Sequence, residues 1–251
     1  MLKQRLIVIL TLNDGVLYRT KRFKPDYRYT INYVDSALAD EVIMLDITRP
    51  GQGDRDNFVR TVEAFSDRSL VPLTVGGGIR TLDDAKELLA YGADKVVVNT
   101  GAVERPDLIS EIAGLMGAQA VVLSIDAWRG IDGYEYDTYE VLTGFGTRTT
   151  DWDPAAWASI AVGLGAGEIL VTSIERDGSL LGYDNTLNRQ VVDAVSVPVL
   201  CAGGVGNWQH LVDALNVGVS GVCVSNIFHM TETSLRAAKT HMKGSGCLVR
   251  L

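Results

Sequence analysis

One aspartate in the sequence stands where a carboxylate could move protons. Asp126 ends the apolar segment VVLSID, which has the composition of a buried strand. A carboxylate at the carboxyl end of a strand can take a proton from a bound ligand and return it. Thr11 ends a comparable segment, LIVILT, and a hydroxyl does not replace a carboxylate as a base near neutral pH. If the chemistry needs a second carboxylate, the candidates are Asp46 and Asp177, whereas Asp14 in the sequence NDG is expected in a turn.

Glycines and short polar residues follow several apolar segments and could bind anions. Without a Cβ atom, a glycine backbone can approach a ligand closely and point its N–H group at a negative charge. The residues fall into two groups: Gly77, Gly78, Asn99 and Thr100 in the first, and Asp177, Gly178, Gly203, Gly204, Ser225 and Asn226 in the second. Two such groups predict a ligand with a phosphate at each end. The alternative is that the glycines serve only tight turns between strands and helices.

An internal repeat relates these two groups. Residues 71–100 align with residues 197–226 without a gap, so that Gly77 matches Gly203. Each segment has the pattern of a strand, a glycine turn, a helix and a second strand, which is the unit of a parallel sheet. The two halves of the chain are therefore expected to have similar structures.

Eight strands alternating with helices are expected along the chain. Strand-like segments cover residues 6–11, 42–46, 71–75, 96–98, 120–125, 169–172, 197–201 and 221–224, and helical periodicity covers residues 30–38, 54–65, 81–91, 105–116, 153–165, 186–193, 207–216 and 231–242. Eight such units in two similar halves predict an α/β fold, a single (β/α)8 TIM barrel over residues 1–251 with a two-fold half-barrel repeat, rather than a doubly wound sheet. The two longest loops, residues 12–29 and 127–151, follow strands one and five, at the end where such barrels carry their chemistry.

Composition argues against several classes of function. The formal net charge of −8 argues against a nucleic acid as the main partner. No apolar run reaches membrane-spanning length, and the N-terminal segment has the pattern of a first strand rather than of a signal peptide, so we expect a cytoplasmic protein without a membrane partner. Cys201, Cys223 and Cys247 form no CxxC pair and are expected to be buried reduced thiols, and we expect neither a metal nor another cofactor.

Four charged residues immediately precede or begin four of the expected strands. They are Arg5, Glu41, Lys95 and Glu168, before strands one, two, four and six, whereas the other four strand starts carry no charge. Two positive and two negative groups could close into a neutral ring at the amino end of the barrel, with each charge paired. The alternative is that these side chains only border the strands and point to water.

Several longer motifs together resemble one known family. They are LDIT (45–48), LTVGGGIR (73–80), ADKVVVNT (93–100), SIDA (124–127), GAGEILVTSIERDG (165–178), the glycine pair at 203–204 and the C-terminal VRL (249–251). The chain resembles the cyclase subunit of imidazole glycerol phosphate synthase over essentially its whole length.

The resemblance implies a function and a set of residue roles. In that family the barrel binds a bisphosphorylated ribonucleotide across its mouth, and a glutaminase subunit docks on its opposite face to form a heterodimer. Ammonia from glutamine enters the barrel through a charged gate, whose positions match Arg5, Glu41, Lys95 and Glu168. Asp94 and Gln119 match the glutaminase-facing surface, Arg19 matches a basic residue in the loop after strand one, and Asn99, Thr100, Gly203, Gly204, Ser225 and Asn226 match the phosphate positions.

The sequence departs from this family at one catalytic position. The first catalytic aspartate of the family falls on Thr11, within ILTLNDG where CLDVKDG is usual, and the second falls on Asp126. A chain that keeps the charged gate but lacks the full acid–base pair resembles a branch of cyclase-like proteins found with surface-polysaccharide genes. The proteins of that branch work with a glutaminase and a sugar amidotransferase. Residues 19–32 and 146–150 also resemble that branch.

Four functions remain open from the sequence. We favour a cyclase-like barrel that docks a glutaminase and conducts ammonia for a sugar amidotransferase. The first alternative is an active histidine-pathway synthase in which another carboxylate, such as Asp46, compensates for Thr11. The second is a non-catalytic scaffold that activates the glutaminase allosterically, and the third is an unrelated phosphosugar isomerase with the same fold.

Overall fold

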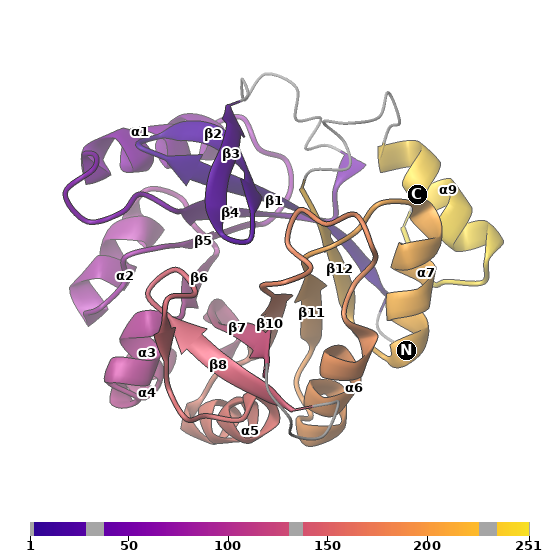
Figure 1. Cartoon of the computed structure of the whole chain (residues 1–251). Helices are drawn as coiled ribbons and strands as arrows, with labels where there is room; N and C mark the ends of the chain where they lie inside the picture. Colours follow the sequence, from indigo (N-terminus) through magenta and orange to yellow (C-terminus); the bar gives the residue numbers. More distant parts are fainter. Residues whose placement is uncertain (1–2, 29–37, 131–137, 226–234, 251) are drawn as a thin grey trace.

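The chain folds into a closed barrel of eight parallel strands (Figure 1). The structure is a computed structural model that describes residues 3–28, 38–130, 138–225 and 235–250. The barrel strands are β1 (Arg5–Asn13), β4 (Glu41–Asp46), β5 (Leu73–Gly76), β6 (Lys95–Val98), β7 (Val121–Arg129), β10 (Glu168–Ser173), β11 (Val199–Ala202) and β12 (Gly221–Val224). Parallel pairing between β7 and β10 closes the circle that runs through β11, β12, β1, β4, β5 and β6. The predicted (β/α)8 barrel is confirmed.

Helices connect the barrel strands and lie around the barrel (Figure 1). They are α1 (Arg55–Ser66), α2 (Leu82–Ala90), α3 (Thr100–Glu104), α4 (Asp107–Met116), α5 (Pro154–Leu164), α6 (Asn185–Ala194), α7 (Trp208–Val217) and α9 (Leu235–Gly244), with a short 3-10 turn η3 (Ala118–Ala120) before β7. Side-chain caps begin several of them; Thr81 and Asp84, for example, form a reciprocal capping box at α2. The predicted helix over 30–38 falls almost entirely outside the described residues.

One predicted helix is preceded by a separate short one. The sequence predicted a helix over 105–116, and α4 occupies Asp107–Met116, whereas the short helix α3, which ends before Arg105, was not predicted. Arg105 has φ −145° and ψ 85°, an extended conformation, because a residue before proline is sterically excluded from the helical region.

The two long connections are β-hairpins rather than plain loops, which corrects the prediction. β1 continues to Asn13 and pairs with β2 (Val16–Lys21), which pairs with β3 (Lys24–Arg28). The second connection contains β8 (Tyr139–Thr143) and β9 (Arg148–Thr149), which extend from β7. The first turn consists of Asp14 and Gly15, with φ of 52° and 72°, the conformation that Asp-Gly favours in a two-residue hairpin. The predicted turn at Asp14 is confirmed.

The interior is apolar on both sides of the barrel wall. One cluster of buried side chains fills the space between the strands and the helices, and a smaller one lies inside the barrel around Ile7, Ile43, Val97 and Leu170. Cys201, Cys223 and Cys247 are buried and unpaired, as predicted. Within the described residues, no helix has the length and apolar character to cross a membrane.

Candidate active site and charged ring

The four charged residues predicted at the amino end of the barrel meet in one ring. Lys95 Nζ lies 3.0 Å from both carboxylate oxygens of Glu41 and 2.9 Å from Glu168 Oε2. Arg5 donates to Glu41 at 2.9 Å and also to Glu168. Each cation therefore contacts both anions, and we call these four residues the charged ring. The side chains face inward because alternate residues of a strand point to the same side of the sheet.

The charged ring is largely withdrawn from water. Glu41 and Glu168 are 2% and 4% exposed, and Thr74 supplies a further hydrogen bond to Glu41 at 2.6 Å. Burial alone would lower the pKa of Arg5, but Glu168 and Glu41 outweigh it and hold this pKa above its ordinary value. Pairing on both sides is what keeps such charges stable in a poorly solvated place.

Above the charged ring, the barrel interior becomes apolar and then opens into a cavity. Along β6, Lys95 is followed on the same face by Val97 and Asn99, so one strand passes from the ring through an apolar layer to the far end. Ile9, Val97 and Cys223 belong to this layer and also line a cavity of about 720 Å³ at the carboxyl ends of the strands. We call this end of the barrel the mouth.

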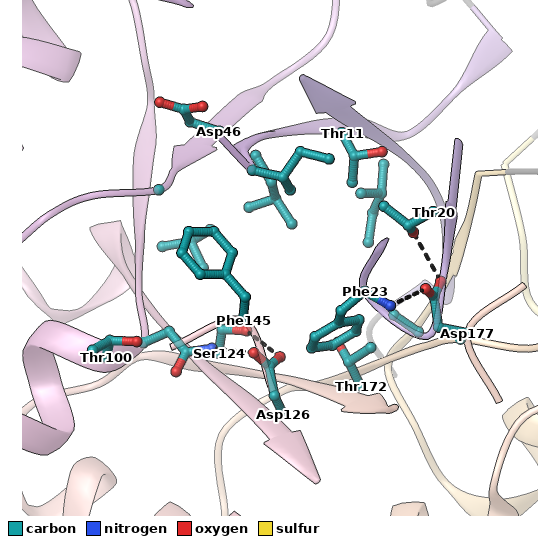
Figure 2. A pocket seen from close by; sticks show the side chains of 18 of the residues that line it. Thr11, Thr20, Phe23, Asp46, Thr100, Ser124, Asp126, Phe145, Thr172 and Asp177 are labelled. Atoms are coloured by element: carbon teal, nitrogen blue, oxygen red, sulfur yellow. Dashed lines mark hydrogen bonds between the residues drawn. The ribbon is translucent and has the colours of Figure 1, made fainter. Parts of the chain in front are cut away.

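Asp126 occupies the wall of this cavity (Figure 2). Its Oδ2 accepts a hydrogen bond from the side-chain amide of Asn99 at 2.7 Å, and its Oδ1 lies 3.5 Å from the Ser124 hydroxyl. Burial raises the pKa of Asp126 to about 7, although these two hydrogen bonds act to lower it. A carboxyl group with this pKa can act as a base or as an acid near neutral pH.

Thr11 lies across the cavity from Asp126 (Figure 2). Its strand, β1, is four positions from β7 in the circle of eight, and so stands opposite to it. The Thr11 hydroxyl donates a hydrogen bond to the carbonyl oxygen of Tyr18 on the neighbouring strand β2. The hydroxyl hydrogen is therefore engaged in a bond within the β1–β2 hairpin. At the position of Thr11, the wall of the cavity carries no ionisable group.

The two other carboxylates predicted near the mouth are held by backbone and side-chain donors. Asp46 accepts from the Thr48 backbone N–H at 2.9 Å. Asp177 accepts from the Thr20 hydroxyl at 3.1 Å and from the Phe23 backbone N–H at 3.0 Å. Burial raises the pKa of Asp177, while these two hydrogen bonds oppose the rise. Asp177 thus anchors the tip of the β2–β3 hairpin across the mouth (Figure 2).

The predicted anion-binding residues gather at the mouth, with one exception and one gap. Gly77, Gly78, Asn99, Thr100, Asp177, Gly178, Gly203, Gly204 and Ser225 line the cavity. Arg19 does not line it but pairs with Asp26 on the β2–β3 hairpin, and Asn226 lies outside the described residues. The glycines also satisfy packing, because a Cβ atom on Gly77 would stand 2.5 Å from the Asp46 carbonyl oxygen and one on Gly204 2.3 Å from the Gly182 carbonyl oxygen. Close packing against these carbonyl groups is therefore enough to require glycine at both positions, even without a bound ligand.

The residues predicted at the partner-facing surface lie at the amino end of the barrel. Asp94 directly precedes β6, and its carboxylate accepts from the Leu73 backbone N–H at 2.8 Å. Gln119, in the turn before β7, donates to the Met116 carbonyl at 2.9 Å. Both residues are exposed and lie on the side of the charged ring. Among the described residues, no cluster of three or more His, Cys, Asp or Glu residues could hold a metal ion.

Comparison with known proteins identifies the family of the chain. A family profile described as histidine biosynthesis protein matches residues 7–234. The chain belongs to this family. Within the histidine biosynthesis protein family, it is 41% identical over 256 aligned residues to the imidazole glycerol phosphate synthase subunit HisF of Bacillus subtilis (strain 168), with 100% of each chain covered. These findings support the histidine-pathway alternative better than the surface-polysaccharide branch that the sequence favoured.

Several residues of the cavity were missed by sequence reasoning, and three of them bear on its chemistry. Phe23, Arg49 and Phe145 line the cavity, and the first and last of these have positive φ angles of 61° and 64°. The sequence GFG around Phe145 contained a turn signal, but nothing in the pattern indicated that the phenylalanine would face the mouth. Arg49 lies directly after the LDIT motif and had no distinguishing neighbour in the sequence.

Proposed function

We propose that the chain is the ammonia-using synthase subunit of a glutamine amidotransferase, of the imidazole glycerol phosphate synthase type. A glutaminase docks on the amino-end face, and its ammonia passes through the charged ring and the apolar layer to Asp126. The single observation that carries this proposal is that the charged ring, the apolar layer and Asp126 follow one another inside one barrel. The curated relative bears the name of such a subunit, which supports the same activity here.

The chemistry of the barrel interior suits neutral ammonia. An ammonium ion would lose its hydration in the apolar layer without gaining a counter-charge, whereas ammonia loses far less. The charged ring is neutral overall and its carboxylates are already paired with Lys95 and Arg5, so it offers an ammonium ion no free counter-charge. Ring opening requires one of these paired side chains, most simply Lys95, to leave its carboxylates for the moment of passage.

Asp126 supplies the proton transfers at the mouth. When the nitrogen of ammonia bonds to a carbon of the ligand, it gains positive charge and must release a proton, which the ionised Asp126 accepts. The same carboxyl group can then return the proton to a departing group of the ligand. A pKa of about 7 allows both steps near neutral pH, so one carboxyl group can alternate between the two roles.

A second candidate function rests on Thr11. Because the Thr11 hydroxyl is bonded to the Tyr18 carbonyl, the β1 side of the cavity offers no acid or base at that position. A barrel that needs both carboxylates would then pass its ammonia to another acceptor, such as a sugar handled by a separate amidotransferase. The scaffold alternative has less support, because a buried carboxyl group with a raised pKa reduces stability and has no use in a scaffold.

The deciding experiment measures synthase activity of the purified chain with an ammonium salt and the histidine-pathway bisphosphate substrate. We expect turnover that is lost in Asp126→Asn. Turnover by the native chain comparable to that of Thr11→Asp supports the histidine-pathway reaction. No turnover by the native chain with recovery in Thr11→Asp supports the second candidate. No turnover in either protein, or isomerisation of a phosphosugar without any ammonia, rejects the proposal.

A further inference from the structure

Arg49 presents to the cavity a guanidinium that pairs with no carboxylate of the described residues. Three arginines line the cavity, and two of them, Arg80 and Arg148, share the carboxylate of Glu104. Within the described part of the chain, the Arg49 side chain makes no hydrogen bond and no ion pair, although its backbone carbonyl accepts from the Gln52 N–H at 3.0 Å. Its Cζ instead lies 4.8 Å from the centre of the Phe145 ring. A partly buried guanidinium with free N–H donors is a binding site for an anion.

The turn that carries Phe145 is held in a costly conformation. Gly144, Phe145 and Gly146 have φ of 60°, 64° and 70°, and the Thr147 N–H closes the turn on the Thr143 carbonyl at 3.0 Å. Left-handed backbone costs a residue with a Cβ atom roughly 1–2 kcal/mol, and a glycine almost nothing. Of these three residues only Phe145 pays this cost, and its ring lies among the side chains that line the cavity (Figure 2).

The contact between Arg49 and Phe145 spans one of the two predicted anion sites. Arg49 follows β4 and Phe145 follows β8, and β5, β6 and β7 lie between these strands in the sheet. The contact therefore joins two loops that flank the carboxyl ends of β5 and β6, where Gly77, Gly78 and Thr100 lie. The turn itself is fixed to this site, because the Gly144 N–H donates to the Thr100 hydroxyl at 3.1 Å.

Most other donors near the same anion site are engaged or neutral, and the two other lining arginines, Arg80 and Arg148, pair with Glu104. The Asn99 side-chain amide donates to Asp126, so this predicted phosphate donor is already engaged. Arg55 approaches the glycine turn, but it bonds to Glu87 and to the Gly77 carbonyl and does not line the cavity. The remaining donors are neutral backbone N–H groups and the Thr100 hydroxyl. Arg49 is the lining arginine whose side chain pairs with no described carboxylate, and a charge-assisted bond to phosphate is about twice as strong as a neutral one.

We propose that Arg49, held in place by the Phe145 ring, binds a phosphate group at the ends of β5 and β6 and makes this the specificity-determining end of the cavity. The other predicted anion site, at Gly203 and Gly204, has no arginine among the described lining residues. The two phosphates of the ligand are thus bound unequally. The β5–β6 end binds its phosphate more tightly than the Gly203–Gly204 end, and it favours the dianionic form of that phosphate. This inference rests on the phosphorylated ligand of the proposed function and adds the residue that selects it.

The test is a titration of the full chain with inorganic phosphate, followed by nuclear magnetic resonance. The Arg49 side-chain N–H signal, assigned by its absence in Arg49→Gln, should shift and saturate together with the Gly78 amide. Arg49→Gln should weaken phosphate binding at Gly78 about tenfold, as expected for loss of a charge-assisted bond. Phe145→Leu, which keeps an apolar side chain but loses the ring, should weaken it about threefold. Arg105→Gln is the matched control, because that guanidinium pairs with Glu111 and does not line the cavity, and should change the affinity less than twofold.

The outcomes separate this inference from the proposed function. If phosphate shifts the Gly203 and Gly204 amides but leaves the Arg49 signal unchanged, the inference is wrong and the phosphate-binding mouth stands. If no amide at either site shifts, the inference and the phosphorylated ligand both fail. If the Arg49 signal shifts and the synthase assay shows no turnover, the inference stands and the proposed reaction fails.

Discussion

The side-chain amide nitrogen of Asn99 lies 2.7 Å from Oδ2 of Asp126. The sequence placed Asn99 among the phosphate-binding residues, yet in the fold its donor is directed at the carboxylate. Burial raises the pKa of Asp126 to about 7, and the bond from Asn99 acts against that rise. The two residues together leave the carboxyl group able to gain or lose a proton near neutral pH.

Removal of the Asn99 bond should move the pH dependence of turnover to higher pH. Turnover by the base form of Asp126 should rise through about pH 7 in the native chain. Asn99→Ala removes a donor that stabilises the ionised form, so the midpoint should rise. Ser124→Ala removes a weaker bond of 3.5 Å and should raise it less. The measurement is kcat/KM against pH at constant free ammonia, and a midpoint that falls in Asn99→Ala would contradict the assignment of Asp126 as the base.

Asp126→Asn should stabilise the fold above neutral pH while it removes activity. The folded-state pKa of Asp126 is raised to about 7 from an ordinary value near 3.8, so the folded state holds its proton more tightly than the unfolded state. Stability from this group is therefore complete below about pH 4 and is lost as the pH rises through about 7. Asparagine cannot ionise, so the variant should have the larger free energy of unfolding at pH 8, by a few kcal/mol at most. Urea unfolding at several pH values measures the difference.

An exposed aspartate provides the control for that comparison. Asp83 is 87% exposed and pairs only with Lys86 on the surface of α2. Asp83→Asn should leave the pH dependence of unfolding close to that of the native chain. An equal gain in stability at pH 5 and pH 8 in Asp126→Asn would show that the ionised form of Asp126 is not the source of the cost.

The strands and most helices could be predicted because local signals and tertiary packing agree. β6 was expected at 96–98 and occupies Lys95–Val98, and α2 was expected at 81–91 and occupies Leu82–Ala90. Buried parallel strands consist almost entirely of branched apolar residues, and caps such as Thr81 mark the helix starts. The start of α4 directly after Pro106 also had a sequence signal, because the residue before a proline is disfavoured in a helix.

The parts that could not be predicted depend on distant segments meeting. Whether Arg5 and Lys95 form a ring or face water depends on the register of several strands around a closed barrel. The sequence of one segment carries no information on that register. The β2–β3 turn places Arg22 and Phe23 at positive φ, where bulky residues are unusual, so its sequence gives no turn signal. That turn is favoured instead by its contacts with Asp177 across the mouth.

Lys95→Met should uncouple glutamine hydrolysis from use of ammonia. Lys95 contacts both Glu41 and Glu168, and its removal leaves Arg5 as their remaining cation in the charged ring. Under the proposed function, ammonia should then escape or fail to enter, so glutamine is consumed in excess of product. Loss of one partner from a buried ion pair costs about 3–5 kcal/mol, so the variant should also be less stable.

Lys86→Met is the matched control for the charged ring. It removes an exposed ion pair with Asp83 and should cost at most about 1 kcal/mol, with coupling unchanged. Both variants should be measured as the complex with the glutaminase, by comparing glutamate formed with product formed. Equal ratios in Lys95→Met and in the native complex would show that Lys95 is not part of the ammonia path.

Asp177→Ala should release the tip of the β2–β3 hairpin from the mouth. Asp177 accepts hydrogen bonds from the Thr20 hydroxyl and the Phe23 N–H, and its carbonyl accepts from the Arg22 N–H at 3.2 Å. The tip includes Lys21 and Arg22, which are exposed residues that trypsin can cut once the backbone can leave its hydrogen-bonded conformation. We therefore expect faster tryptic cleavage in residues 21–24 of the variant, located by mass spectrometry of the fragments.

Asp26→Ala is the control for this comparison. It breaks the pair with Arg19 inside the same hairpin but leaves the bonds to Asp177 intact, so its cleavage rate at these sites should stay near that of the native chain. Equal acceleration in both variants would mean that the hairpin is held by its own contacts rather than by Asp177.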